Sequence, residues 1–195
     1  MRSGRLPTSH RDAKRYPSQG RRARRCGAWR EEAMRMDAKT FRNALGRFAT
    51  GVTVVGIDTP DGPRGITVNA FLSLSLEPPL VGISVDERAG AHAALEAADA
   101  YGVSVLAASQ RELSDRFAGR PVEPTVTWET LDGAPVLGGA LVHLACRIVA
   151  RHVTGDHTLF VGQVTATQVR DGTPLLYHRG RYGVDGTSEP ETVSE

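Results

Sequence analysis

The side chains best suited to bind a ligand lie between residues 65 and 76, where polar and apolar residues alternate. Successive side chains of a β-strand point to opposite faces, so a single strand here would place one polar set together: Thr67, Asn69, Phe71, Ser73 and Ser75. Its other face would be apolar: Ile66, Val68, Ala70, Leu72, Leu74 and Leu76. A row of hydroxyl groups with one amide can hydrogen-bond a polyol or a phosphate. The pattern also fits a strand surface that faces solvent, and the spacing leaves both interpretations open.

Common catalytic signatures are missing from the sequence. It contains no GxSxG, no Walker loop, no HExxH and no GxGxxG after a predicted strand, which disfavours a serine hydrolase, a P-loop enzyme, a zinc protease and a Rossmann nucleotide site. The two cysteines, Cys26 and Cys146, form no CxxC pair, and no metal site is expected. Cys146 falls on the apolar face of a predicted strand, where a small buried side chain is expected.

Residues 1–35 differ in charge from the rest of the 195-residue chain. They hold eleven Lys and Arg against three Asp and Glu, a net charge of +8, whereas the remaining residues hold 13 against 19, a net charge of −6. Because residues 1–35 show no apolar periodicity, we expect a disordered basic extension. Such an arm could bind nucleic acid, serve as a targeting peptide, or be an upstream extension with Met34 or Met36 as the working start.

The acidic remainder of the chain, with 6% aromatic residues overall, disfavours nucleic-acid binding by the folded part. No apolar run approaches the roughly 18 to 20 residues of a membrane helix, and none provides the apolar core of a secretory signal. We therefore expect a cytoplasmic protein with no membrane and no nucleic-acid partner.

The pattern along residues 37–185 predicts many strands and few helices. Asp37 is a candidate N-cap for a helix that Gly51 would end, with Phe41, Leu45 and Phe48 at helical spacing. Two more helices are expected, at 89–100 and 110–118, and residues 119–139 are expected to be mostly loop. Strands are expected at 52–57, 65–76, 80–85, 101–106, 140–153, 158–169 and 175–182. This order favours an antiparallel barrel.

Several segments together resemble the flavin reductase-like family. Residues 41–55 (FRNALGRFATGVTVV) are similar to its N-terminal signature, and residues 67–75 followed by Pro78-Pro79 are similar to its flavin-binding strand. Further segments follow in the family's order: 109–110, 116–119, 133–137, Cys146, 155–162, 174–177 and 181–182. Each motif is weak by itself, but the whole series in register, over about 37–183, is specific.

The resemblance implies an FMN-binding split barrel, mainly β and antiparallel with a few short peripheral helices, that works as a homodimer. Its domain would span 36–185, between the basic extension at 1–35 and a disordered tail at 186–195. The implied activity is that of an NAD(P)H:flavin oxidoreductase, which reduces FMN or FAD with NADH or NADPH and supplies a separate flavin-dependent monooxygenase. An FMN-dependent oxidase and a non-catalytic flavin-binding electron carrier of the same fold remain alternatives.

The resemblance also implies roles for individual residues. The flavin would be bound by Thr67, Val68, Asn69, Ala70, Phe71 and Ser73, its phosphate by Arg88, Ala89 and Gly90, and it would be approached by Phe117 and Ala118. His157 would be the catalytic residue beside the nicotinamide, with Arg181 and Tyr182 closing the NAD(P)H side; the alternative is that His157 only caps a hairpin turn. Many relatives carry Ser or Thr where this chain has Ala89 and Ala91, so phosphate binding would depend on Arg88, His92 and backbone amides.

Overall fold

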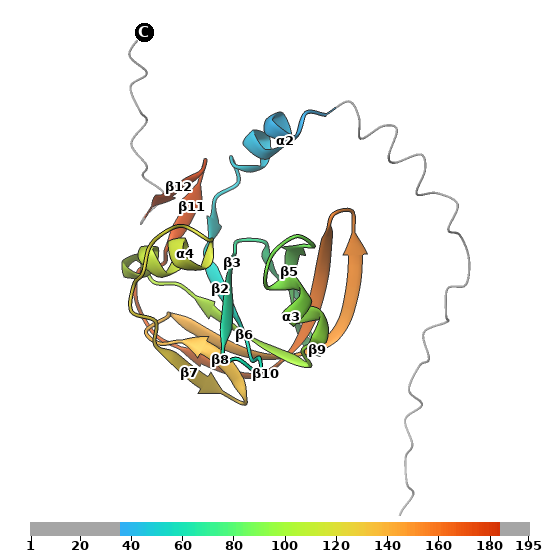
Figure 1. Ribbon diagram of the computed structural model, residues 1–195, viewed down its shortest axis with the longest axis vertical. Helices are drawn as coiled ribbons and strands as arrows, with labels where there is room; N and C mark the ends of the chain where they lie inside the picture. The colour runs from blue at the N-terminus through green and yellow to red at the C-terminus, as the bar shows by residue number, and fades with distance from the viewer. Residues whose placement is uncertain (1–35, 184–195) are drawn as a thin grey trace, which may run out of the picture. The chain divides into compact units, whose positions relative to one another are not determined.

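The computed structural model describes residues 36–183, which form mainly antiparallel β-structure (Figure 1). The two segments expected to be disordered, 1–35 and 186–195, lie outside the described residues. None of the helices in the described range is long and apolar enough to cross a membrane.

Seven strands form the main sheet, in the order β3-β2-β6-β9-β10-β5-β4, with antiparallel neighbours throughout. Their bounds are β2 (Thr53–Ile57), β3 (Arg64–Val68), β4 (Phe71–Leu76), β5 (Pro79–Asp86), β6 (Ala100–Val105), β9 (Val142–Thr154) and β10 (His157–Val169). The two edge strands, β3 and β4, are consecutive in the chain and are joined by residues 69–70 alone. The sheet therefore curls round on itself without pairing its edges, which confirms the expected split barrel.

Smaller elements complete the described part of the chain. A three-stranded sheet contains β1 (Thr50–Gly51), β11 (Leu176–His178) and β12 (Arg181–Gly183), and a hairpin contains β7 (Trp128–Leu131) and β8 (Ala134–Leu137). The helical segments are α2 (Ala38–Leu45), α3 (His92–Ala97), the 3₁₀ turn η2 (Ala108–Gln110) and α4 (Arg111–Phe117). The expectation of a few short helices is confirmed.

The single strand predicted over 65–76 is wrong. Residues 64–68 pair with β2 and residues 71–76 pair with β5, so the chain changes sheet edge at Asn69 and Ala70. A bulge between Ser73 and Ser75 further disturbs the alternation in β4. Nothing in a period-two pattern distinguishes one long strand from two strands that meet at a corner, because neither glycine nor proline interrupts it here.

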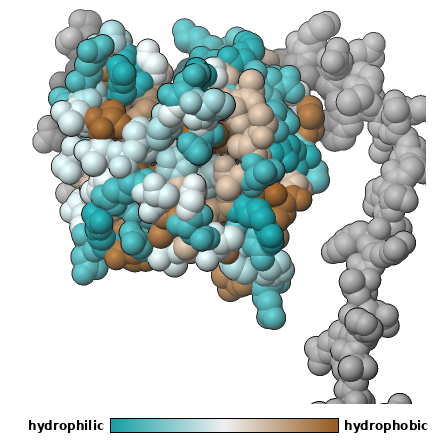
Figure 2. All heavy atoms as spheres, turned by 60° about the horizontal axis from the view of Figure 1, so that its bottom comes forward, coloured by the Kyte–Doolittle hydropathy of each residue, from teal (hydrophilic) through white to brown (hydrophobic). Residues whose placement is uncertain are grey.

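The exposed residues of β4 do not match the solvent-facing alternative, because apolar side chains are exposed along with Ser73. Leu72 and Leu74 are 41% and 42% exposed and Leu76 is 90% exposed, whereas Phe71 and Ser75 are half-buried. The space-filling view in Figure 2 also shows apolar residues at the surface, interspersed among hydrophilic ones. β4 thus exposes a row of leucine side chains, whereas a strand surface that only faces solvent would expose polar ones.

The boundaries of two helices differ from the prediction. Asp37 does cap α2, since its Oδ2 accepts the Thr40 N–H at 2.9 Å, but the helix ends at Leu45 and Gly51 pairs with Leu176 in β1. The helix expected over 89–100 is confined to α3.

Two hairpins replace a predicted loop and a predicted single strand. Residues 119–139 contain β7 and β8, and the segment predicted at 175–182 forms β11 and β12, which ends at Gly183. Both hairpins turn through two residues with positive φ, Asp132-Gly133 and Arg179-Gly180. Such pairs suit the tight turns that match strand twist.

The interior divides into two apolar clusters. One contains Val55, Ile83, Tyr101 and Phe160, and the other contains Val54 together with Leu106 and Leu137. Cys146 is 1% exposed, which confirms that it is a buried thiol, and burial raises the pKa of this thiol to about 12. Trp128 packs against the second cluster.

Candidate functional site

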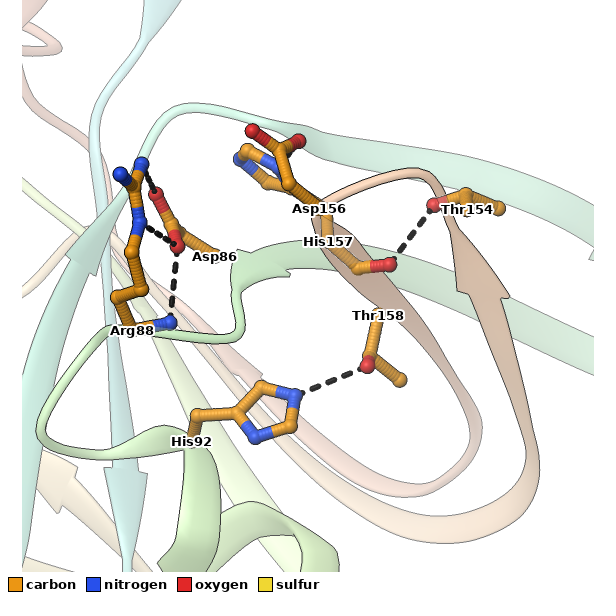
Figure 3. Close-up of polar contacts among 7 residues, drawn as sticks. All are labelled: Asp86, Arg88, His92, Thr154, Asp156, His157 and Thr158. Carbon is orange, nitrogen blue, oxygen red and sulfur yellow. Dashed lines mark hydrogen bonds and ion pairs between the residues drawn. The ribbon is translucent and has the colours of Figure 1, made fainter. Parts of the chain in front are cut away.

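A group of charged side chains lies where β5 ends and the β9–β10 hairpin turns (Figure 3). Arg88 bonds Asp86 in three ways: its Nε donates to Oδ1 at 3.0 Å, its Nη2 to Oδ2 at 2.8 Å, and its backbone N–H to Oδ1 at 2.9 Å. These bonds hold the pKa of Asp86 well below its usual range and raise the pKa of Arg88. The guanidinium remains 81% exposed, so it can still meet a ligand.

His157 lies beside this pair, because its register partner across the sheet is Asp86. Its Nδ1 lies 2.7 Å from Asp156 Oδ1, and the contact lowers the pKa of Asp156. The imidazole is 40% exposed. A carboxylate at Nδ1 fixes the orientation of the ring and leaves Nε2 for an outside partner.

The His92 side chain, at the start of α3, is held in place by two residues of β10. Its Nε2 lies 2.9 Å from the buried hydroxyl of Thr158, and its ring meets Phe160 edge-on at 5.6 Å between centroids. A His92 side chain held in this way is only 14% exposed, so it offers less to a phosphate than Arg88 does.

A second polar group joins β3, α4 and β12. Thr67 Oγ1 donates to the Ser114 carbonyl at 2.7 Å, and Tyr182 Oη lies 2.9 Å from both Ser114 Oγ and Asp115 Oδ1. Asp115 also accepts from Arg120 Nη1 at 2.9 Å. Desolvation of the phenol is the main cause of a raised pKa at Tyr182. The Thr67 hydroxyl therefore positions α4, and toward a ligand its oxygen can act only as an acceptor.

The corner at residues 69–70 connects the two groups along the chain. It follows Thr67 by two residues, and the Ala70 carbonyl accepts the Ser84 N–H at 3.1 Å, two residues before Asp86. Asn69 and Ala70 are exposed, and the Asn69 amide makes no hydrogen bond to the residues that the structure describes. Together these features form an open corner at residues 69–70, in which the Asn69 amide is unused. Along the chain, the Arg88 guanidinium and the His157 imidazole belong to the group on one side of this corner, and α4 belongs to the group on the other.

Some of the predicted site residues have different surroundings. The Phe117 ring packs on Gly65 and, at 5.5 Å between centroids, on Trp128, so it belongs to the second apolar cluster. Val68 is a core residue at 5% exposure, whereas Ser73, Gly90 and Ala118 are exposed. Ala89 donates its N–H to the Asp86 carbonyl at 2.9 Å, and space is open where a Gly90 side chain would be.

The residues expected on the NAD(P)H side do not form one group in a single chain. His157 lies in the β9–β10 hairpin beside Asp86, whereas Tyr182 packs on α4 and Tyr177, and Arg181 lies opposite His178 in the β11–β12 hairpin. Figure 1 shows α4 with β11 and β12 on one side and the β9–β10 hairpin on the other.

Sequence reasoning missed Asp86 and Asp115, which hold Arg88 and Tyr182. Asp86 had a local signal, since an acidic residue that lies two residues before a basic one at the end of a strand can form an ion pair with it. Asp115 had none, because its partner Tyr182 is 67 residues away.

The same substitution, Tyr to Phe, is expected to have opposite effects at two positions. Tyr101 is fully buried, and its hydroxyl has no nitrogen or oxygen partner in the described residues, facing only the Cys146 thiol. We expect Tyr101→Phe to raise the free energy of unfolding by about 1 kcal/mol, and Tyr182→Phe to lower it by about 1 kcal/mol. Urea denaturation of both variants measures the difference, and destabilisation by Tyr101→Phe would contradict the assignment.

A family model described as "Flavin reductase like domain" matches residues 45–184. This chain belongs to the flavin reductase-like family. Within this family, FMN reductase (NADH) SmoA of Agrobacterium fabrum is 46% identical over 150 residues, which cover 75% of this chain and 86% of SmoA. The reductase component of 4-hydroxyphenylacetate 3-monooxygenase of Thermus thermophilus is 43% identical over 145 residues, which cover 74% of this chain and 94% of that protein.

Solved flavin reductases have the same fold. Flavin reductase PheA2 aligns with a TM-score of 0.74 and 41% identity, covering 76% of this chain and 98% of PheA2. NADH:FAD oxidoreductase SgcE6 of Streptomyces globisporus, in complex with NAD and FAD fragments, aligns with a TM-score of 0.72 and 38% identity, covering 79% of this chain and 96% of SgcE6.

Proposed function

We propose that this chain transfers a hydride from NADH to FMN or FAD and supplies the reduced flavin to a separate monooxygenase. The observation that carries the proposal is the match to NADH-dependent reductases of FMN and of FAD along most of their length, at 46% and 41% identity. Relatives that are reductase components of monooxygenases support the partner. The same relatives favour NADH over NADPH.

The residues of the open corner suit a flavin. Asn69 offers an unused amide, Arg88 an exposed guanidinium, and the open space beside Gly90 leaves room for a ligand. We assign the flavin ring and ribityl chain to the corner around Thr67, Asn69 and Ala70. We assign the phosphate to the segment that begins at Arg88, since guanidinium groups bind phosphates in bidentate fashion. The half-buried Phe117 contributes by packing rather than by contact with the flavin.

Hydride transfer is chemistry that flavin and nicotinamide supply when both are bound. The chain's part is to hold the two rings together and to exclude water. In this scheme His157, oriented by Asp156, stabilises negative charge at the flavin or binds the nicotinamide amide through Nε2. Tyr182 and Arg181 would close the NADH side.

The proposal is tested by steady-state assays with the four pairs of NADH or NADPH and FMN or FAD. Rapid loss of NADH absorbance in the presence of flavin is the expected result. A protein that retains flavin through gel filtration and oxidises neither nucleotide would instead be an electron carrier or an oxidase acting on its own substrate. Added monooxygenase component should form product only when reductase, NADH and flavin are all present.

We also propose a homodimer in which the outward apolar row of β4 is covered by the partner. Leu72 and Leu74 lie on an edge strand whose exposed face no described residue covers, and such faces commonly mark interfaces. A partner would also offer a second Tyr182 and Arg181 to each His157. Because the proposed reaction consumes NADH, we place the dimer in the cytoplasm.

Replacing Leu72 and Leu74 together by aspartate is expected to convert the dimer to a monomer. Two buried carboxylates at the interface would cost several kcal/mol of association free energy, and sedimentation velocity measures the change in mass. Val169→Asp is the matched control, since Val169 is 72% exposed at the far end of β10 and should leave the dimer intact. A double variant that stays dimeric would place the interface elsewhere.

A further inference from the structure

The contact that stands out in the proposed site is the one that already occupies Arg88. Asp86 takes the Nε and Nη2 edge of the guanidinium with both carboxylate oxygens, at 3.0 and 2.8 Å. This is the edge with which arginine commonly grips a phosphate in bidentate fashion. A phosphate must therefore displace the carboxylate or bind the remaining edge beside it.

The charges around Arg88 make either route unfavourable. Besides Asp86, the neighbouring carboxylate is that of Asp156, whose backbone carbonyl accepts the Glu87 N–H at 3.0 Å. Asp156 and Arg88 are close enough to interact electrostatically, as are Asp86 and Asp156. Two carboxylates thus accompany one guanidinium.

We propose that Asp86 competes with the flavin phosphate for Arg88 and keeps the affinity low enough for the flavin to be exchanged as a substrate. This inference rests on the proposed function, in which Arg88 binds that phosphate. It adds Asp86 as a residue that weakens the binding of the flavin phosphate. Since the bonds from Arg88 hold the pKa of Asp86 far below neutrality, the competition persists at every pH at which the enzyme would work.

The competition should depend on the phosphate alone. Riboflavin carries the same ring and ribityl chain as FMN but has no phosphate, so Asp86 should not affect its binding. Removing one carboxylate a few ångströms from a phosphate that carries nearly two charges should tighten FMN binding about tenfold at low salt. Added NaCl should reduce this gain, because mobile ions screen exposed charges.

The experiment measures the dissociation constants of FMN and riboflavin by titration of flavin fluorescence for five proteins. These are the unaltered protein, Asp86→Asn, Asp86→Ala, Arg88→Gln and the control Asp61→Asn, which removes a carboxylate in the distant β2–β3 turn. We expect both Asp86 variants to bind FMN about tenfold more tightly and to retain it through gel filtration. Riboflavin binding should stay unchanged in all five proteins, and Arg88→Gln should weaken FMN only.

The possible failures are distinguishable. If Arg88→Gln weakens FMN and the Asp86 variants weaken it too, Asp86 supports Arg88 instead of competing, and the inference is overturned while the assignment of Arg88 stands. If Arg88→Gln weakens FMN and the Asp86 variants leave it unchanged, the inference is again overturned. If Arg88→Gln leaves the ratio of FMN to riboflavin affinity unchanged, the phosphate assignment within the proposed function fails and the inference fails with it.

Discussion

Replacing Gly102 by alanine is expected to destabilise the protein by about 3 kcal/mol, the largest effect on stability that we foresee for a single methyl group. Gly102 on β6 and Gly56 on β2 are register partners, and together they form a flat notch in the sheet. The Pro135 carbonyl of β8 lies in this notch, so close that an added Cβ at either glycine would overlap it. Because the obstacle is backbone, it cannot rotate away, and overpacking of this kind commonly costs 1 to 3 kcal/mol or more.

Thermal and urea unfolding of Gly102→Ala measure this effect. The control is Gly51→Ala, because no atom lies within 4 Å of the position where its Cβ would be. We expect the Gly51 variant to unfold close to the unaltered protein. If both variants unfold alike, β8 is not seated in the notch as described, and the second apolar cluster is packed more loosely than the structure indicates.

Replacing His157 by alanine is expected to lower kcat for flavin reduction by about ten- to a hundredfold without unfolding the protein. A positioned hydrogen-bond donor at a developing negative charge contributes about a hundredfold or more when desolvated, and the 40% exposure of His157 reduces that figure. Asp156, whose Oδ1 lies 2.7 Å from Nδ1, and Asp86, its register partner, both lie beside the imidazole. A ring held in this way is ready to interact with charge at the flavin.

Steady-state kinetics with saturating flavin and varied NADH separate the two roles assigned to His157. A fall in kcat alone points to charge stabilisation, whereas a rise in KM for NADH points to binding of the nicotinamide amide. His152→Ala is the matched control, since His152 lies on the same hairpin, is exposed, and has no assigned role. Unchanged kinetics in His157→Ala would leave His157 as a turn residue only.

Local sequence signals account for much of the fold. Strand and helix types follow from β-branched runs, from the Asp37 cap and from the amphipathic pattern of residues 110–118, and each of these elements is present. The β7–β8 hairpin also had a local signal in Asp132-Gly133, a typical two-residue turn. The many Pro and Gly residues around it led to a loop assignment, although Pro135 lies within an edge strand, where a missing donor is tolerated.

The antiparallel class, the family and most of the helices and strands are predictable from the sequence, because propensity, period and ordered motifs are properties of neighbouring residues. The tertiary structure was needed to establish that the polar segment 65–76 bends at Asn69 and Ala70 to join two sheet edges. It also decided that Thr67 supports α4, that Asp86 holds Arg88, and that His157 lies apart from Tyr182. These facts depend on which distant residues meet and on which bonds they leave free, and the spacing of residues along a chain carries no such information.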